Sequence, residues 1–309
     1  MSAWTTHDIP PQSGKFALVT GATGGLGYET ALALADAGAD VILAGRNEQK
    51  GRDALQAIRK SVPSARLHFE TLDLADLASV AEFSARIADR YPRVDVLVNN
   101  AGVMALPRRQ TTRDGFETQF GTNYLGHFAL TAQLLPLLRA SGGARVVSLA
   151  SLAHRQGRID FGDLQGERLY KPWKAYSQSK LAMLMFALEL QRRSDAKGWG
   201  LMSNAAHPGW ALTDLIANGP DSDGPQRVLN GLSVLFKPWL SQSAAAGALP
   251  TLFAATSPAA ANAGYYGPDG FYELKGAPVP AKIFRQASDI EVAKRLWEVS
   301  EQLTATRFR

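Results

Sequence analysis

The stretch FALVTGATGGLG, residues 16–27, decides the fold of this 309-residue chain. A short apolar run is followed at once by a glycine-rich turn, and the turn opens a helical pattern that ends near Gly38. Gly21 permits a tight turn, Gly25 lets the backbone approach a phosphate, and Gly27 lets the helix pack closely on a sheet. The helix N-terminus adds unpaired N–H groups and the positive end of a dipole. The stretch predicts a dinucleotide-binding unit; a purely structural turn is the competing interpretation.

The same alternation of strand and helix continues along the chain. Short, continuously apolar strands separated by helices indicate a parallel sheet covered on both faces. We expect an α/β fold, a Rossmann-like doubly wound parallel sheet in a single domain over 1–309, with 1–14 as an extended lead-in. Functional residues should follow the strands, because such sheets bind ligands at the carboxyl ends of their strands. Further strands are expected within VILAG (41–45), LHFETLDL (67–74), VDVLVNNAG (94–102), RVVSLAS (145–151) and GLMSNAAHPG (200–209).

Composition excludes several classes of function. The net charge is +5, but no block of like charges interleaves with aromatic residues, so no nucleic-acid partner is expected. The chain has no cysteine, which excludes disulfides and thiolate catalysis. His127, His154 and His207 match no zinc spacing, so no metal is expected. The first residues lack a signal-peptide pattern and no apolar run is long enough to cross a bilayer, so we expect a cytoplasmic protein without a transmembrane segment.

The second apolar run ends in AGRN. Arg46 therefore stands where an NAD-specific protein carries an acidic residue that holds the ribose hydroxyls. A guanidinium suits a 2′-phosphate through its charge and its forked donors. We expect NADP(H) to be preferred over NAD(H), with a solvated surface arginine as the alternative.

Two tyrosines in LYKPWKAYSQSK, residues 169–180, precede a lysine by four positions. Such a pair shares one face only within a helix. Pro172 follows Tyr170 and favours the first turn of a helix, so Tyr170 and its lysine are not expected on one helix face. Tyr176 and Lys180 fall inside the helix with no breaker between them. We assign acid/base chemistry to this second pair, since a nearby ammonium favours the phenolate that a general base requires.

Several motifs occur together in one order along the chain: TGATGGLG (20–27), NNAG (99–102), Asn123, Ser151, YSQSK (176–180) and HPG (207–209). In this combination the chain resembles the short-chain dehydrogenase/reductase family over about residues 14 to 300. The segment SLAHRQGRIDFGDL looks like the retinol-dehydrogenase-like branch, which includes WW-domain oxidoreductases, protochlorophyllide reductases and bacterial ketoreductases. WW modules are absent, as are the cysteines typical of the protochlorophyllide branch.

The resemblance implies a catalytic role for four residues. Tyr176 exchanges the proton, Lys180 also holds the nicotinamide ribose, and Ser151 orients the carbonyl oxygen. Asn123 matches the asparagine that kinks a long helix and holds a water of the proton relay. Ser148 points to the opposite face of its strand and is expected to be a buried hydroxyl bonded to backbone.

The resemblance also implies contacts along the whole cofactor. Asp73 and Leu74 match the adenine pocket, and the segment from Pro208 matches the nicotinamide end. Gly24 stands where NADP-preferring relatives often carry a polar contact, which leaves Arg46 more of the task. The expected cofactor-binding residues are Gly21, Thr23, Gly25, Leu26, Gly27, Arg46, Asp73, Leu74, Asn99, Ala101, Gly102, Tyr176, Lys180, Pro208, Gly209 and Thr213.

Residues 210–243 break the alternation of strands and helices. They are expected to form a lid over a small hydrophobic carbonyl or alcohol substrate. The alternative is ordinary packing or a patch that touches a membrane. Two other functions stay open: a C=C reductase of the protochlorophyllide type and a catalytically idle NADP-binding sensor or scaffold. The helix near 174–193 fits a homodimer in a four-helix arrangement, as in many relatives, or the core of a monomer. The apolar lid candidates are Trp210, Leu212, Leu215, Leu235, Phe236, Trp239 and Leu240.

Overall fold

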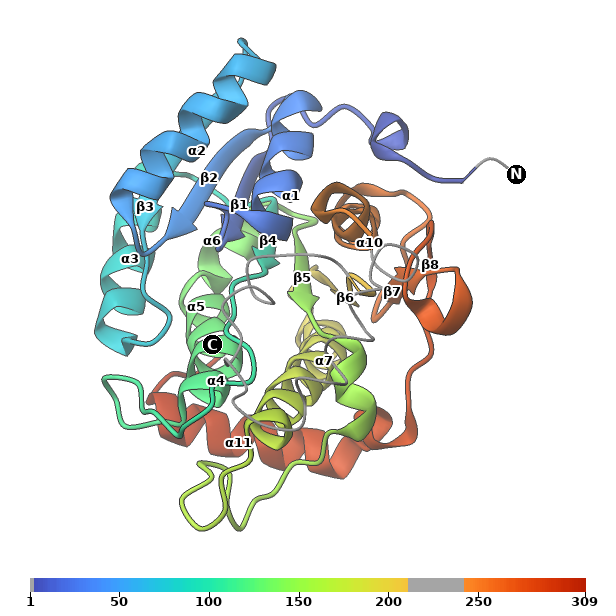
Figure 1. Cartoon of the computed structure of the whole chain (residues 1–309). Coiled ribbons are helices and arrows are strands. Elements are labelled where there is room, and N and C mark those ends of the chain that lie inside the picture. Colours follow the sequence, from blue (N-terminus) through green and yellow to red (C-terminus); the bar gives the residue numbers. More distant parts are fainter. Residues whose placement is uncertain (1–2, 211–241) are drawn as a thin grey trace.

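A single twisted sheet forms the centre of the computed structural model, which describes residues 3–210 and 242–309 (Figure 1). The strand order is β3-β2-β1-β4-β5-β6-β7-β8, and every neighbouring pair is parallel except the last. The order reverses between β1 and β4, which is the expected doubly wound arrangement. The strands are β1 Phe16–Thr20, β2 Asp40–Gly45, β3 Arg66–Thr71, β4 Val96–Asn99, β5 Arg145–Leu149, β6 Met202–Ala206, β7 Tyr265–Pro268 and β8 Pro278–Pro280.

Helices cover both faces of the sheet, as predicted. One core lies under α1, α2 and α10, and a larger one lies under α3, α5, α6 and α7. The central strands are buried on both sides, which explains their continuously apolar sequences. The helices are α1 Gly25–Asp36, α2 Glu48–Ser61, α3 Leu77–Arg90, α4 Thr118–Phe120, α5 Gly126–Gln133, α6 Leu135–Ala140, α7 Pro172–Lys197, α10 Ala244–Thr256 and α11 Ile290–Thr304.

The sheet is wider than the sequence predicted. β7 extends it beyond β6, and β8 adds an antiparallel edge. Both strands are short and contain proline, which hides them from a search for apolar runs. Proline is typical of an edge strand such as β8.

The N-terminal lead-in is not wholly extended, so that expectation is corrected. Thr6–Asp8 form one 3-10 turn, because the Asp8 carboxylate accepts a hydrogen bond from the N–H of Thr5 at 2.7 Å. The indole of Trp4 packs edge-on against Phe253 of α10, with ring centroids 5.4 Å apart. These contacts hold the segment against the sheet's first helical layer.

The long helix α7 is covered by α11, which crosses it at the bottom of Figure 1. Between Tyr176 and Gln191 every residue of α7 is buried except Leu188, which is half-buried. Trp297 of α11 stacks on Phe186 of α7, with ring centroids 5.7 Å apart. The chain's own C-terminal helix thus occupies the apolar surface of α7.

The part of the chain that the structure describes contains no helix long and apolar enough to span a bilayer. The cytoplasmic location stays a prediction. Of the lid candidates only Trp210 lies within the described residues; Leu212, Leu215, Leu235, Phe236, Trp239 and Leu240 lie outside them, and so does Thr213.

Candidate active site

The glycine loop has the backbone that the sequence predicted. Gly21 and Gly25 have φ values of 65° and 53°, which lie in the left-handed region that favours glycine. A Cβ atom on Gly27 would lie 2.3 Å from the carbonyl oxygen of Gly21 and 2.5 Å from the side-chain nitrogen of Asn100. The loop thus leaves its backbone bare at the start of α1, where N–H groups are available to a phosphate.

A cavity of about 860 Å³ runs along the carboxyl ends of the strands. Arg46 after β2 lies at one end of the strand order, and Pro208 after β6 lies toward the other. The glycine loop lies between them, so the residues present fit a dinucleotide laid across the sheet. The predicted residues that line this cavity are Gly21, Thr23, Gly25, Leu26, Gly27, Arg46, Asp73, Leu74, Ala101, Gly102, Ser151, Tyr176, Lys180, Pro208 and Gly209.

Two of the described candidates, Asn99 and Asn123, do not line the cavity, and Asn123 is fully buried. Among the expected cofactor-binding residues the exception is Asn99. It is 1% exposed, and its amide donates to the hydroxyl of Thr131 at 3.1 Å. The next residue, Asn100, lines the cavity instead and donates to the carbonyl oxygen of Thr20 at 2.7 Å. Because the two asparagines are adjacent and identical, the sequence offered no basis for deciding which one faces the cavity.

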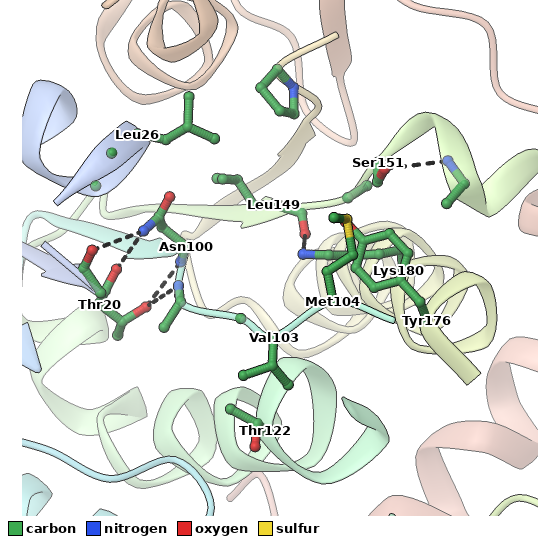
Figure 2. A pocket seen from close by; sticks show the side chains of 18 of the residues that line it. Thr20, Leu26, Asn100, Val103, Met104, Thr122, Leu149, Ser151, Tyr176 and Lys180 are labelled. Atoms are coloured by element: carbon green, nitrogen blue, oxygen red, sulfur yellow. Dashed lines mark hydrogen bonds between the residues drawn. The ribbon is translucent and has the colours of Figure 1, made fainter. Parts of the chain in front are cut away.

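The two tyrosine–lysine pairs have different surroundings. Pro172 begins α7, and Lys171 before it is extended, with φ −131° and ψ 123°. Tyr170 therefore lies outside the helix, and its hydroxyl donates to the carbonyl oxygen of Leu106 at 2.7 Å. Tyr176 lies one turn into α7 and faces the cavity beside Lys180, as Figure 2 shows.

Burial controls the ionisation of this pair. It raises the pKa of Tyr176, and a hydrogen bond with Ser151 offsets only part of that effect. It also lowers the pKa of Lys180 to about 8. The Lys180 ammonium donates to the carbonyl oxygen of Leu149 at 2.9 Å (Figure 2). The sequence argument expected a lysine to favour the phenolate; in this structure the desolvation of Tyr176 raises its pKa instead.

Ser151 and Ser148 separate as the strand period predicts. Ser151 lies two residues past β5 and lines the cavity, where its hydroxyl accepts a hydrogen bond from the N–H of Ala153 at 3.2 Å. Ser148 is fully buried, but its hydroxyl has no hydrogen-bond partner among the described residues. The expected bond from Ser148 to backbone was therefore wrong.

Asn123 lies in a π-helical segment, Gly121–Leu125, that interrupts the helix between α4 and α5. Its side chain accepts from the N–H of Val103 at 2.7 Å and donates to the carbonyl oxygen of the same residue at 2.9 Å. The same amide donates to Ser179 of α7 at 2.9 Å. Asn123 thereby ties the loop after β4 to the helix that carries the tyrosine.

His127 extends this network, and the sequence analysis missed it. Its Nδ1 donates to the carbonyl oxygen of Asn123 at 2.9 Å, so its Nε2 accepts the hydroxyl of Thr20 at 2.9 Å. The Thr20 oxygen accepts the N–H groups of Asn100 and Ala101 at 2.9 and 3.0 Å. The spacing of four residues from Asn123 was the one available signal.

Acid is expected to destabilise the protein through two buried histidines. Burial lowers the pKa of His127 and of His154 to about 4, below the ordinary value of 6.5. Between these values the unfolded chain binds more protons than the folded one. The free energy of unfolding should therefore fall as the pH drops from 6.5 to 4, by up to about 1.4 kcal/mol per pH unit for each histidine.

Urea unfolding across this pH range measures the effect. Carboxylates titrate there too, so the readout is the difference between wild type and His127→Asn, whose pH slope should be shallower. Equal slopes would contradict the prediction.

Comparison with known proteins identifies the family. The model of the short chain dehydrogenase family matches residues 15–223. Mouse polyprenol dehydrogenase is 43% identical over 301 residues, which cover 96% of this chain and 85% of that protein. Human retinol dehydrogenase 13 is 42% identical over 292 residues, covering 94% of this chain and 84% of that protein.

Solved structures agree with these relatives. A crystal structure of an uncharacterized protein from Mycobacterium paratuberculosis has 40% identity and a TM-score of 0.82, with full coverage of both chains. A short chain dehydrogenase from Shigella flexneri complexed with NADP has 27% identity and a TM-score of 0.62, over 81% of this chain and 93% of that one. The chain therefore belongs to the short-chain dehydrogenase family, in its retinol-dehydrogenase-like branch, and is an oxidoreductase acting on CH–OH or C=O groups.

Proposed function

We propose that the protein transfers hydride between NADP(H) and a hydrophobic ketone, aldehyde or secondary alcohol, with Tyr176 as the general acid/base. The observation that carries the proposal is the meeting of Tyr176, Ser151 and Lys180 on one cavity that also reaches Arg46. The Shigella flexneri neighbour complexed with NADP supports the choice of cofactor class.

Each residue has a separate task in this chemistry. The nicotinamide supplies or accepts the hydride when it is bound. The Tyr176 hydroxyl gives its proton to the substrate oxygen in reduction and takes one in oxidation. Ser151, which lines the same cavity as Tyr176, orients that oxygen. The Lys180 ammonium adds positive charge that favours the ionised phenol in the transition state.

An apolar wall supports a hydrophobic substrate. Side chains from the loops after β4 and β5, from α7 and from the last segments of the chain surround the tyrosine. Relatives named for polyprenol and retinol, both apolar alcohols, support the same substrate class. The apolar residues at this end of the cavity are Val103, Met104, Leu152, Trp173, Trp210 and Leu274.

Arg46 is expected to decide the preference for NADPH over NADH. Its side chain is exposed at the cavity and has no ion pair or hydrogen bond among the described residues. Its charge is therefore available to a 2′-phosphate. Arg46→Ala should weaken NADPH binding roughly tenfold to a hundredfold, the net value of a charged hydrogen bond, and leave NADH binding nearly unchanged.

Fluorescence titration of both nucleotides tests this. Arg52→Ala is the matched control, because Arg52 is exposed on α2 and paired with Glu48 at 3.4 Å. Equal affinities of the wild type for NADPH and NADH would contradict the proposed preference, and an Arg46 variant that behaves like the control would remove Arg46 from it.

We also propose that the protein does not form the four-helix dimer through α7. Between residues 176 and 191 only Leu188 is partly exposed, because the sheet, the neighbouring helices and α11 together cover α7. Light scattering after size exclusion should report a mass close to the 33.2 kDa of one chain. A dimer that persists after a charged residue replaces Leu188, the half-buried position, would locate the interface elsewhere.

A further inference from the structure

A cluster of charged groups lies beside the catalytic residues and has no task in the proposed chemistry. The carboxylate of Glu273 accepts a hydrogen bond from Arg155 at 2.6 Å. The same oxygen lies 2.9 Å from Nε2 of His207. Nδ1 of His207 accepts the N–H of Gly209 at 3.2 Å, so Nε2 carries the proton and donates to Glu273.

The partners of Glu273 come from two loops at the same end of the cavity. Arg155 lies in the 3-10 turn Leu152–Gln156, which follows Ser151 directly and lines the cavity. His207 follows β6 and precedes Pro208 and Gly209, which line it from the other side. One carboxylate thus joins the turn of the catalytic serine to the loop assigned to the nicotinamide.

The backbone around Glu273 is strained. Tyr272 and Glu273 have φ values of 51° and 61°, although neither is glycine. Such a conformation is unfavourable for a residue with a side chain and persists only where the surroundings impose it. Here the carbonyl oxygen of Leu274 accepts the N–H of Trp210 at 2.7 Å, and a Cβ on Gly209 would lie 2.3 Å from that oxygen. The turn is therefore locked onto the loop after β6.

The ionisation of Glu273 also supports a fixed arrangement of these groups. Burial would raise the pKa of Glu273, but the hydrogen bond from His207 and the charge of Arg155 outweigh it and lower the pKa. The carboxylate is therefore held ionised between Arg155 and His207, and the backbone N–H of Lys282 donates to its other oxygen at 3.4 Å. The neighbouring buried rings of His154 and Tyr265 contact each other, Tyr265 also contacts the ring of His207, and neither residue brings a competing carboxylate.

We propose that Glu273 is a positioning residue that fixes the Ser151 turn and the Pro208–Gly209 loop relative to each other, and so sets the nicotinamide end of the site. This inference rests on the proposed function, because it presumes that a nicotinamide nucleotide occupies the cavity. It assigns Glu273 no contact with the adenosine end, where Arg46 lies on the far side of the glycine loop.

The test compares the affinity for NADPH, which spans the whole cavity, with the affinity for 2′,5′-ADP, which lacks the nicotinamide half. Glu273→Gln keeps the size of the side chain and removes its charge. The variant should weaken NADPH binding roughly tenfold. This is the effect expected when one charged hydrogen bond that positions the two loops is lost. The affinity for 2′,5′-ADP, which reaches only the adenosine end, should stay within about twofold of wild type. Energy transfer from tryptophan to bound NADPH reads the same displacement without turnover, because Trp173 and Trp210 line the cavity.

Two further variants complete the design. Glu291→Gln removes an exposed ion pair on α11, with Lys294 at 2.8 Å, and should leave both affinities unchanged. Arg155→Gln removes the other partner of the cluster and should reproduce the selective loss of NADPH affinity. If both variants lose NADPH affinity selectively, the loss comes from the interaction they share and not from a folding defect of one variant.

The results that would overturn the positioning role of Glu273 differ from the result that would overturn the proposed function. Equal loss of NADPH and 2′,5′-ADP affinity, no loss at all, or failure of both variants to fold would give Glu273 a structural role and overturn the proposal. A wild-type protein that binds neither nucleotide would overturn the proposed function first, and this inference with it.

Discussion

Tyr176→Phe is expected to lower kcat by about 10²- to 10⁴-fold while NADPH still binds. The variant keeps the ring but removes the hydroxyl that shares the cavity with Ser151 and Lys180. The substrate oxygen then has no proton donor at the position where Tyr176 faces the cavity. Oxidation of NADPH at 340 nm with a hydrophobic ketone measures kcat, and fluorescence titration measures binding.

Tyr170→Phe is the control inside the same stretch. Its hydroxyl also donates a hydrogen bond, but to the carbonyl oxygen of Leu106, outside the α7 helix. The variant should lose about 1 kcal/mol of stability and little turnover. If Tyr176→Phe retained full turnover, another group would carry the proton. If neither wild type nor variant turned over any carbonyl while both bound NADPH, the idle sensor would become the better interpretation.

Gly27→Ala should weaken NADPH binding roughly tenfold to a hundredfold, as expected when overpacking costs about 1–3 kcal/mol. The new methyl group would meet the carbonyl oxygen of Gly21 and the amide of Asn100 at 2.3 and 2.5 Å. Both are fixed, because the Asn100 amide also bonds the carbonyl oxygen of Thr20. The start of α1 must therefore move, and its N–H groups move with it.

Gly143→Ala provides the comparison, since nothing lies within 4 Å of a Cβ atom at that turn. Nucleotide titration and thermal unfolding of both variants are the measurements. Unchanged NADPH affinity in Gly27→Ala would mean that the phosphate does not depend on the glycine loop.

The parts of the site that follow strands were predictable from the sequence. The glycine loop, Ser151 and Pro208 follow buried strands, and the pattern of apolar runs locates the strand ends. Tyr176 was separable from Tyr170 because Pro172 marks the start of the helix. In each case the signal was local in sequence.

The remainder depends on contacts between distant segments. Glu273 meets Arg155 from 118 positions away, and no local pattern distinguishes it from a surface carboxylate. His127 reaches Thr20 over 107 positions. The raised pKa of Tyr176 likewise comes from burial, which sequence spacing does not report.

In the π-helical segment Gly121–Leu125 the number of residues matters as much as their identity. A π turn accommodates an extra residue in a helix, and each α-helical residue turns the axis by about 100°. Deleting one residue here would regularise the turn and leave the flanking helical segments in register, but the side chains within the turn would change direction. Asn123 could then no longer reach Val103 while His127 reaches Thr20. Conservative substitutions in this segment should be tolerated far better than any single-residue deletion.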